Sequence, residues 1–222
     1  MKTKEKTAIV LGATGVTGSA LVSLLTHHNA YAKIKLFSRS VSGFTHPKID
    51  EYLVDLQDLE KHKSSFTADE VYCCIGTTKA KTPDKETYKN IDYGIPVQAA
   101  KLCKENNINT FMVISALGAN ASSSVFYNKI KGQMEDDVIA LQIPKTYILQ
   151  PSLIAGKRKE KRLGEWLAKQ FLKVFQFLLI GSLKKYKPIH PETIAKAMVW
   201  LGNNEENATK IQSDKIKELG KE

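Results

Sequence analysis

The sequence is poor in cysteine, which excludes a disulfide framework. It has only three cysteines in 222 residues, an odd number with no C-x-x-C spacing. Cys73 and Cys74 are adjacent in an apolar run and Cys103 follows in a helical stretch, so we expect all three to be structural. The five histidines show no metal-ligand spacing either, and no metal site is predicted.

Arginine is also scarce, although the chain is basic. Lysine and arginine total 33 against 23 acidic residues, which gives a net charge of +10. Only Arg39, Arg158 and Arg162 are arginines, whereas proteins that read DNA bases rely on the bidentate arginine fork. The excess charge therefore favours a lysine-covered surface, and no nucleic-acid partner is expected.

Long hydrophobic runs are missing. The longest apolar stretch, 171–183, is interrupted by Lys173 and Gln176 and is shorter than the ~20 residues that a membrane-spanning helix needs. The apolar run 8–11 near the N-terminus is too short for the core of a signal peptide. We therefore expect a cytoplasmic protein with no membrane span.

What the sequence does contain is an alternation of short β-branched runs with amphipathic stretches. The alternation predicts a doubly wound parallel α/β sheet of the Rossmann type. No Gly/Ser-rich or Pro-rich linker divides the chain, so we expect a single domain with a cofactor-binding core (1–150) and a small substrate or lid part (151–222). The predicted strands are 8–11, 34–37, 52–54, 71–75, 111–114 and 146–149, and the predicted helices are 16–28, 85–106, 126–141, 164–179 and 191–201.

A glycine loop joins the first predicted strand to the first helix. Gly12 permits a tight turn, Gly15 lets a pyrophosphate approach the backbone, and Gly18 lets the helix pack against the strand. The N–H groups near Thr14, Val16 and Thr17 lie at a helix N-terminus, which favours an anion. A glycine turn without a ligand is the alternative.

The end of the second strand indicates which dinucleotide is bound. NAD-specific sites place an acidic residue there, but this strand ends in Ser38 and Arg39. The guanidinium fork suits the 2′-phosphate of NADP(H), which is therefore the expected cofactor. The alternative is a solvated arginine at a strand end.

Other loops at the carboxyl ends of strands are expected to line the same crevice. Asp55 and Leu56 follow the third strand, where Asp55 can accept a hydrogen bond from the adenine amine and Leu56 can pack on the adenine ring. Gly76, Thr77 and Thr78 follow the fourth strand. Each of these residues is equally compatible with a plain loop.

The candidate reaction centre is a Y-x-x-x-K pair after the fifth strand. Tyr127 and Lys131 are four residues apart and share a helix face. A tyrosine has a pKa of about 10, and a nearby ammonium lowers that pKa toward a range useful for acid–base catalysis. Ser115 ends the preceding strand, where it is suited to orient a substrate carbonyl. Tyr31 and Lys35 also match the motif, by chance, just before and inside the second strand and away from the carboxyl ends of the strands. A packed tyrosine beside a surface lysine is the alternative interpretation of Tyr127 and Lys131.

These motifs together resemble the atypical short-chain dehydrogenases/reductases, more narrowly the NAD(P)H-binding subgroup around the Tat-interacting oxidoreductase. The resemblance covers nearly the whole chain. It implies a Rossmann fold that binds NADPH, with Tyr127 as acid–base, Lys131 also holding the nicotinamide ribose, and Ser115 positioning the carbonyl. Many relatives place an asparagine where Asn90 stands. The matching residues are Gly12 to Gly18, Ser38-Arg39, Ser115, Tyr127 with Lys131-Gly132, Gln150-Pro151-Ser152, Gly164 to Leu167 and Pro188 to His190, of which Pro151 joins the expected cofactor site.

The expected function is hydride transfer between NADP(H) and a small carbonyl or alcohol substrate. One alternative is a non-catalytic NADP(H)-binding redox sensor that signals to a protein partner. The other is a nucleotide-sugar epimerase, which the short C-terminal part disfavours. The basic amphipathic segment 157–187 is predicted to be a lid or core element, with a partner interface or a membrane surface as alternatives.

Overall fold

One parallel sheet organises the molecule, in a computed structural model that describes residues 5–155 and 186–221. Within these residues the strand order is β3-β2-β1-β4-β5-β6-β7. All neighbouring strands are parallel. The strands are β1 (Lys6–Leu11), β2 (Tyr31–Ser38), β3 (Ile49–Leu53), β4 (Glu70–Cys73), β5 (Thr110–Ile114), β6 (Lys145–Gln150) and β7 (Lys210–Gln212).

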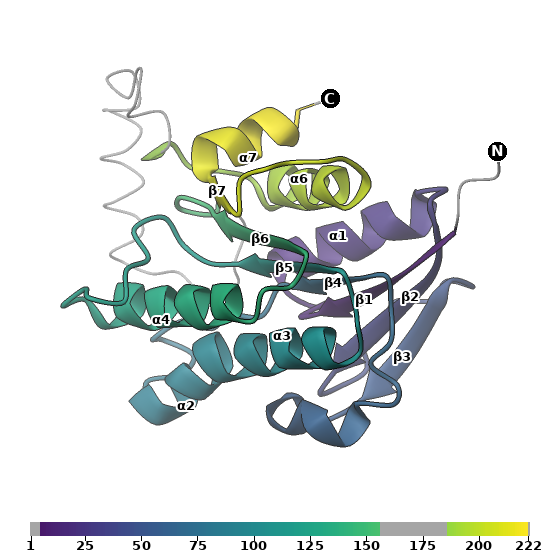
Figure 1. The fold of residues 1–222 in the computed structure, drawn as a ribbon, viewed down its shortest axis with the longest axis horizontal. Helices are drawn as coiled ribbons and strands as arrows, with labels where there is room; N and C mark the ends of the chain where they lie inside the picture. Colours follow the sequence, from purple (N-terminus) through teal and green to yellow (C-terminus); the bar gives the residue numbers. More distant parts are fainter. Residues whose placement is uncertain (1–4, 156–185, 222) are drawn as a thin grey trace.

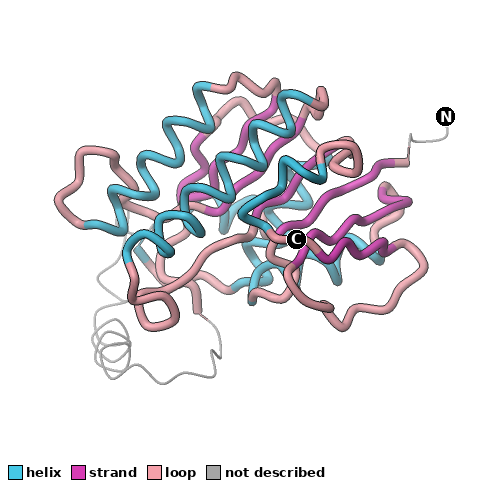
Figure 2. The backbone as a smooth tube through the Cα atoms, turned by 90° about the horizontal axis from the view of Figure 1, so that it is seen from below, coloured by secondary structure: helices cyan, strands magenta, loops and turns pink. Residues whose placement is uncertain are grey.

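Helices cover both faces of the sheet (Figure 1). On one face lie α1 (Val16–His27), α6 (Pro191–Asn203) and α7 (Ser213–Leu219), and on the other lie η1 (Leu56–His62), α2 (Lys85–Lys89), η2 (Asn90–Gly94), α3 (Ile95–Glu105) and α4 (Phe126–Ala140). Figure 2 shows helices lying over the strands, with loops at both ends of the layers. The predicted doubly wound Rossmann-type sheet is confirmed.

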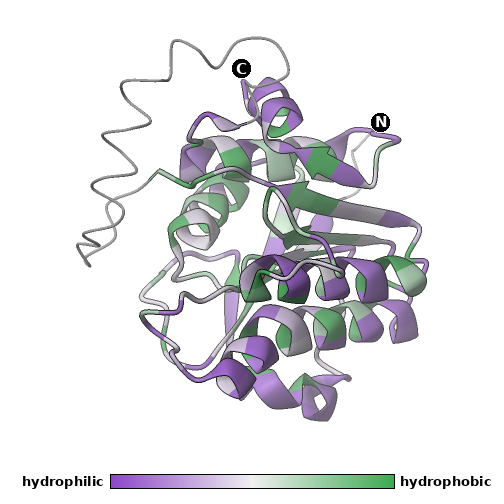
Figure 3. Cartoon of the chain, turned by 90° about the vertical axis from the view of Figure 1, so that its left-hand side faces the viewer, coloured by the Kyte–Doolittle hydropathy of each residue, from purple (hydrophilic) through white to green (hydrophobic). Residues whose placement is uncertain are grey.

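Each face of the sheet has its own hydrophobic core. Val10, Leu36 and Leu149 pack toward α1 and α6, whereas their neighbours Leu11 and Ile148 pack toward α3 and α4. This alternation follows from the period-two geometry of a strand, and a doubly covered sheet must be apolar on both sides. Figure 3 shows hydrophobic and hydrophilic residues alternating along the outer helices, as a single buried face requires.

The cysteines follow the same alternation. Cys73 lies in the core beneath α3, and Cys74 packs against the opposite core, as expected for neighbours in an extended chain. All three cysteines are free, and burial raises the pKa of the Cys73 thiol to about 11. A thiol with so high a pKa carries little thiolate at neutral pH, which fits the structural role predicted for it.

The C-terminal part differs from the sequence expectation. The sixth predicted strand is not the last, because Lys210–Gln212 forms β7 beside β6 and extends the same sheet. A three-residue strand with one buried apolar residue, Ile211, leaves no periodic signal in the sequence. The predicted helix 164–179 and most of the segment 157–187 lie outside the described residues.

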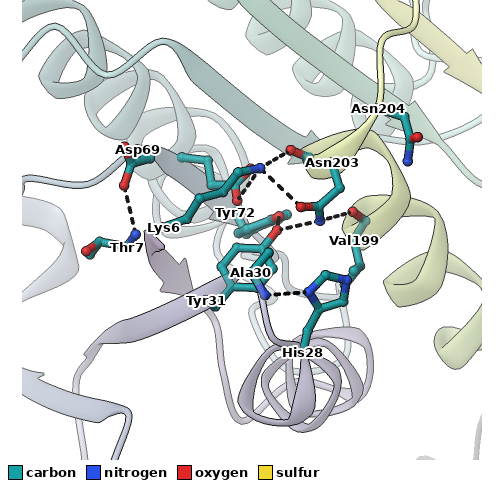
Figure 4. A network of polar contacts seen from close by, with 12 residues as sticks. Lys6, Thr7, His28, Ala30, Tyr31, Asp69, Tyr72, Val199, Asn203 and Asn204 are labelled. Atoms are coloured by element: carbon teal, nitrogen blue, oxygen red, sulfur yellow. Dashed lines mark hydrogen bonds and ion pairs between the residues drawn. The ribbon is translucent and has the colours of Figure 1, made fainter. Parts of the chain in front are cut away.

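A polar network joins α6 to the amino ends of the strands (Figure 4). The Lys6 ammonium lies 3.7 Å from the buried Glu70 carboxylate and donates to Asn203 Oδ1 at 3.2 Å. The Tyr31 and Tyr72 hydroxyls are 2.9 Å apart, and Asn203 Nδ2 donates to Tyr31 Oη at 3.0 Å. Burial raises the pKa of Glu70 above its usual value, although the tyrosine hydroxyls and Lys6 oppose that shift. The pKa of Glu70 is therefore higher in the folded state than in the unfolded state.

Replacing Glu70 with glutamine is expected to flatten the pH dependence of stability. Because the pKa of Glu70 is higher in the folded state, that state binds more protons just above pH 4.5, and the free energy of unfolding falls as pH rises through this window. Urea unfolding between pH 4.5 and 7.5 should show a shallower decline in Glu70→Gln. Glu105→Gln, which changes an exposed partner of Lys63, is the control. Equal slopes in the wild type and Glu70→Gln would contradict this account.

Candidate functional site

The glycine loop after β1 has the geometry of a phosphate-binding turn. Gly12 has a φ of +84°, and a Cβ there would lie 2.8 Å from the carbonyl oxygen of Cys74, the residue that follows β4. A Cβ on Gly18 would lie 2.1 Å from the Gly12 carbonyl oxygen, so α1 packs directly on the turn. The Gly15 N–H donates to Gly12 O at 3.0 Å, which closes the turn, and Thr14 and Gly15 are exposed just before α1 begins.

A cavity of about 410 Å³ lies at the carboxyl ends of β1 to β4. This is where the strand order reverses, between β1 and β4, which is the usual ligand crevice of an open parallel sheet. The predicted cofactor residues that line it are Gly12, Thr14, Gly15, Ser38, Arg39, Leu56, Gly76 and Thr77. Those that do not line it are Val16, Thr17, Gly18, Asp55, Thr78, Lys131 and Pro151.

Several of the predicted residues that do not line the cavity have structural roles beside it. Thr17 and Gly18 are buried in the first turn of α1. Asp55 caps η1 by accepting from the Gln57 N–H at 2.9 Å, and the Pro151 carbonyl accepts from the Leu117 N–H at 2.9 Å. A contact between Asp55 and adenine therefore stays a prediction.

Two charged residues line the cavity within the described part of the chain, and both are cations. Arg39 lies at its β2 side, and Lys81 enters from the loop after β4. Among the described residues that line this cavity there is no aspartate or glutamate. The Lys81 N–H donates to Thr78 O at 2.9 Å, which closes the turn that presents the lysine. Sequence reasoning missed Lys81, because a lysine in a lysine-rich chain carries no signal without that turn.

The candidate reaction centre contains a buried ion pair. Lys131 Nζ lies 3.0 Å from Asp92 Oδ1, and the two side chains are only 3% and 1% exposed. Lys131 also donates to the Ile114 carbonyl at the end of β5, at 3.3 Å. Burial alone would lower the pKa of Lys131, but Asp92 and Tyr127 raise it overall, so the ammonium form is favoured. Tyr127 thus lies within electrostatic reach of a permanent positive charge.

Asp92 reaches Lys131 because the helix after β4 is not a regular α-helix. The residues 90–94 form a π-helical turn, in which the Ile95 N–H bonds to the Asn90 carbonyl. Such insertions are frequent at functional sites. The turn leaves Asn90 exposed and buries Asp92, whose second oxygen accepts from the Thr77 N–H at 2.8 Å. Asp92 therefore connects a residue that lines the cavity to the reaction centre, and the sequence reasoning, which noted Asn90, missed it.

Ser115 stands at the end of β5 as expected, but its side chain makes a contact that the sequence did not predict. Its side chain is buried, and Ser115 Oγ donates to Glu135 Oε1 at 2.5 Å. A hydroxyl has one proton to donate, so in this arrangement it is not offered to a substrate carbonyl. The structure thus gives Ser115 a supporting contact beneath the site, whereas Tyr127 on the same side of the molecule is 39% exposed.

A close backbone contact fixes the first turns of α4. A Cβ on Gly132 would lie 2.1 Å from the Ala121 backbone nitrogen, so the loop that follows β5 crosses directly over this helix. The Asn120 N–H donates to the Asn128 carbonyl at 2.9 Å, which attaches the same loop to the first turn. Gly132 therefore has a packing role next to Lys131.

Comparison with known proteins shows the family. A family model described as NAD(P)H-binding matches residues 12–171, and the chain belongs to this family. The match begins at Gly12, the first glycine of the loop after β1, and includes β2 to β6. The NAD(P)-binding Rossmann character expected from the sequence is confirmed.

Among the relatives are proteins called FMP52, mitochondrial, and HTATIP2. FMP52 of Debaryomyces hansenii is 32% identical over 205 residues, covering 88% of this chain and 87% of the relative. FMP52 of Candida albicans is 38% identical over 165 residues, covering 72% of each. HTATIP2 of Rattus norvegicus is 30% identical over 174 residues, covering 77% of this chain and 72% of the relative. The predicted resemblance to the Tat-interacting subgroup is confirmed.

The cytoplasmic location predicted from the sequence is contradicted by these relatives. Several of the fungal proteins similar to this chain are named mitochondrial. The prediction relied on not seeing a targeting segment, and that is weak evidence. No helix in residues 5–155 and 186–221 is long and apolar enough to cross a membrane.

Solved structures of similar fold include enzymes with bound nucleotides. A UDP-N-acetylglucosamine 4-epimerase from Methanobrevibacter ruminantium has a TM-score of 0.68 and 16% identity, over 97% of this chain and 81% of that one. A UDP-glucuronic acid 4-epimerase from Bacillus cereus, solved with NAD, has a TM-score of 0.65 and 17% identity over 93% and 77%. At these identities the likeness shows the Rossmann-like fold alone.

Proposed function

We propose that this protein is an NADP(H)-dependent oxidoreductase that acts on a small carbonyl or alcohol substrate. The observation that carries the proposal is the chain of contacts from the cavity to the reaction centre. Thr77 lines the cavity and bonds to Asp92, which pairs with Lys131, and Lys131 lies one helical turn from Tyr127. In this proposal the cavity and the acid–base pair are therefore parts of one site.

The residues present fit a phosphorylated dinucleotide. The turn at Gly12 has no room for a Cβ, as close backbone packing at a phosphate loop requires. Arg39 and Lys81 supply positive charge, and none of the described residues that line the cavity carries a carboxylate that would repel an anion. Arg39 is the residue that we assign to the 2′-phosphate, and the preference for NADP(H) over NAD(H) rests on it.

In this proposal the chain positions the cofactor and moves one proton. The nicotinamide, when bound, supplies or accepts the hydride. The Tyr127 hydroxyl donates a proton to the substrate oxygen during reduction and accepts it during oxidation. The Lys131 ammonium stabilises the tyrosinate that forms when Tyr127 gives up its proton, and Asp92 holds Lys131 in place.

NADPH oxidation at 340 nm, with a panel of small aldehydes, ketones and quinones, tests the proposal. We expect turnover of at least one carbonyl, with NADPH preferred to NADH. Tight NADPH binding without turnover of any member would contradict the enzymatic proposal.

The second candidate is a non-catalytic NADP(H) sensor that acts through a protein partner. The contact between Ser115 and Glu135 favours it, because the expected carbonyl-orienting hydroxyl is engaged elsewhere. The two candidates differ in their response to Tyr127→Phe, which a sensor tolerates. Epimerase chemistry has no support here beyond a shared fold.

A further inference from the structure

A buried carboxylate that the proposed reaction does not use lies beneath the reaction centre. Glu135 on α4 is fully buried and accepts from Ser115 Oγ at 2.5 Å and from Gln150 Nε2 at 2.9 and 3.0 Å. Its Oε2 also pairs with Lys210 Nζ at 2.9 Å. The carboxylate thus joins α4 to the residue that follows β5, to the end of β6 and to the start of β7.

The position of Glu135 on α4 relates it to the acid–base pair. Tyr127, Lys131 and Glu135 are spaced by four residues, so they share one face of the helix. Lys131 and Glu135 are both buried beneath that face, and Tyr127 lies at the exposed end of the row. Any roll or slide of α4 about Glu135 therefore moves the Tyr127 hydroxyl and the Lys131 ammonium.

Lys210 is the cation that balances Glu135 among the described residues. It is 43% exposed and comes from β7, and β7 is held against β6 by a three-residue ladder. A buried carboxylate without a positively charged partner strongly destabilises the folded state. Loss of Lys210 therefore strains the attachment of α4 at Glu135 while leaving the cavity, which none of these residues lines, untouched.

We infer that Glu135 is a positioning residue for the reaction centre and that Lys210, from the C-terminal strand, supplies its counter-charge. The inference rests on the proposed function in taking Tyr127 and Lys131 as the reacting pair. It gives Ser115 a role as well, since its hydroxyl fixes the carboxylate from the β5 side.

The test compares three variants in the full-length protein. Lys210→Met removes the counter-charge, Lys210→Arg keeps it, and Lys215→Met removes a surface lysine of α7 that pairs with Glu218. For each we measure the NADPH dissociation constant by calorimetry and kcat for NADPH oxidation with 9,10-phenanthrenequinone, a reactive dicarbonyl probe. Hydrogen exchange of a peptide covering α4 reports on the helix without any turnover.

We expect Lys210→Met to lower kcat about tenfold or more, since small misplacements of reacting groups cost up to about 100-fold. Its NADPH affinity should stay within about twofold of wild type, as for a substitution away from the binding site. Exchange in α4 should accelerate. Lys210→Arg should restore kcat and slow exchange, and Lys215→Met should match the wild type.

An unchanged kcat in Lys210→Met, or a loss that arginine does not restore, would overturn the inference. A wild-type protein that binds NADPH but does not reduce the quinone or the carbonyl panel counts against the proposed enzymatic function instead. In that event exchange alone decides the inference. Faster exchange of α4 in Lys210→Met, reversed in Lys210→Arg, supports it, and equal exchange in all variants overturns it.

Discussion

Tyr127→Phe is expected to lower kcat for carbonyl reduction by about 10²- to 10⁴-fold, the usual contribution of a positioned acid–base group. The phenyl ring keeps the packing of Tyr127 but cannot donate a proton. Tyr127 does not line the cavity, so the NADPH dissociation constant should stay within about twofold. Stopped-flow absorbance at 340 nm and titration calorimetry measure the two quantities.

Tyr93→Phe is the matched control for this variant. Tyr93 bonds through its hydroxyl to Asp137 on α4, at 2.5 Å, so the control removes a hydroxyl contact of the same helix outside the proposed reaction centre. Its kcat should stay near that of the wild type. If the two variants behaved alike, with turnover intact in both, Tyr127 would not be the proton donor and the sensor alternative would gain support.

Gly18→Ala is expected to damage both the fold and the cofactor site. The new Cβ would lie 2.1 Å from the Gly12 carbonyl oxygen, which belongs to backbone and cannot rotate away. The strain of such overpacking typically costs about 1–3 kcal/mol. The clash can be relieved only if α1 moves away from the turn, which would open the glycine loop. NADPH affinity should therefore fall at least about tenfold, or about 1.4 kcal/mol.

Chemical denaturation and calorimetry together check this prediction. Gly94→Ala is the control, because a Cβ at this helical glycine meets nothing within 4 Å. Alanine favours a helix over glycine by about 1 kcal/mol, so this control should be neutral or slightly stabilising. Wild-type stability and NADPH affinity in Gly18→Ala would show that α1 does not pack on the turn as described.

The fold and the cavity could be predicted from the sequence because their signals are local. The glycines at 12, 15 and 18 stand between an apolar run and an amphipathic helix, and Arg39 stands at a strand end, so position alone places them at one edge of the sheet. The structure brings Gly12, Gly15 and Arg39 to the same cavity. Parallel strands guarantee that their carboxyl ends meet, whatever the side chains.

The inner contacts of the reaction centre could not be predicted in this way. Asp92 turns inward because of a single π-helical turn, which shifts the helical register by one residue and has no periodic signature. The partner of Ser115 is Glu135, twenty positions away, and the partner of Glu135 is Lys210 on a strand of three residues. Such contacts depend on tertiary packing between elements, whereas sequence periods describe each element alone.

The measurement that tests the central claim most directly is titration calorimetry of NADPH and NADH against the wild type and Arg39→Ala. We predict that NADPH binds at least about tenfold more tightly than NADH, because a charge-assisted contact to the 2′-phosphate contributes about 1.5–3 kcal/mol. In Arg39→Ala the NADPH affinity should fall to the level of NADH, and NADH affinity should be unchanged. Equal affinities in the wild type, or no binding of either nucleotide, would contradict the assignment of this cavity to NADP(H).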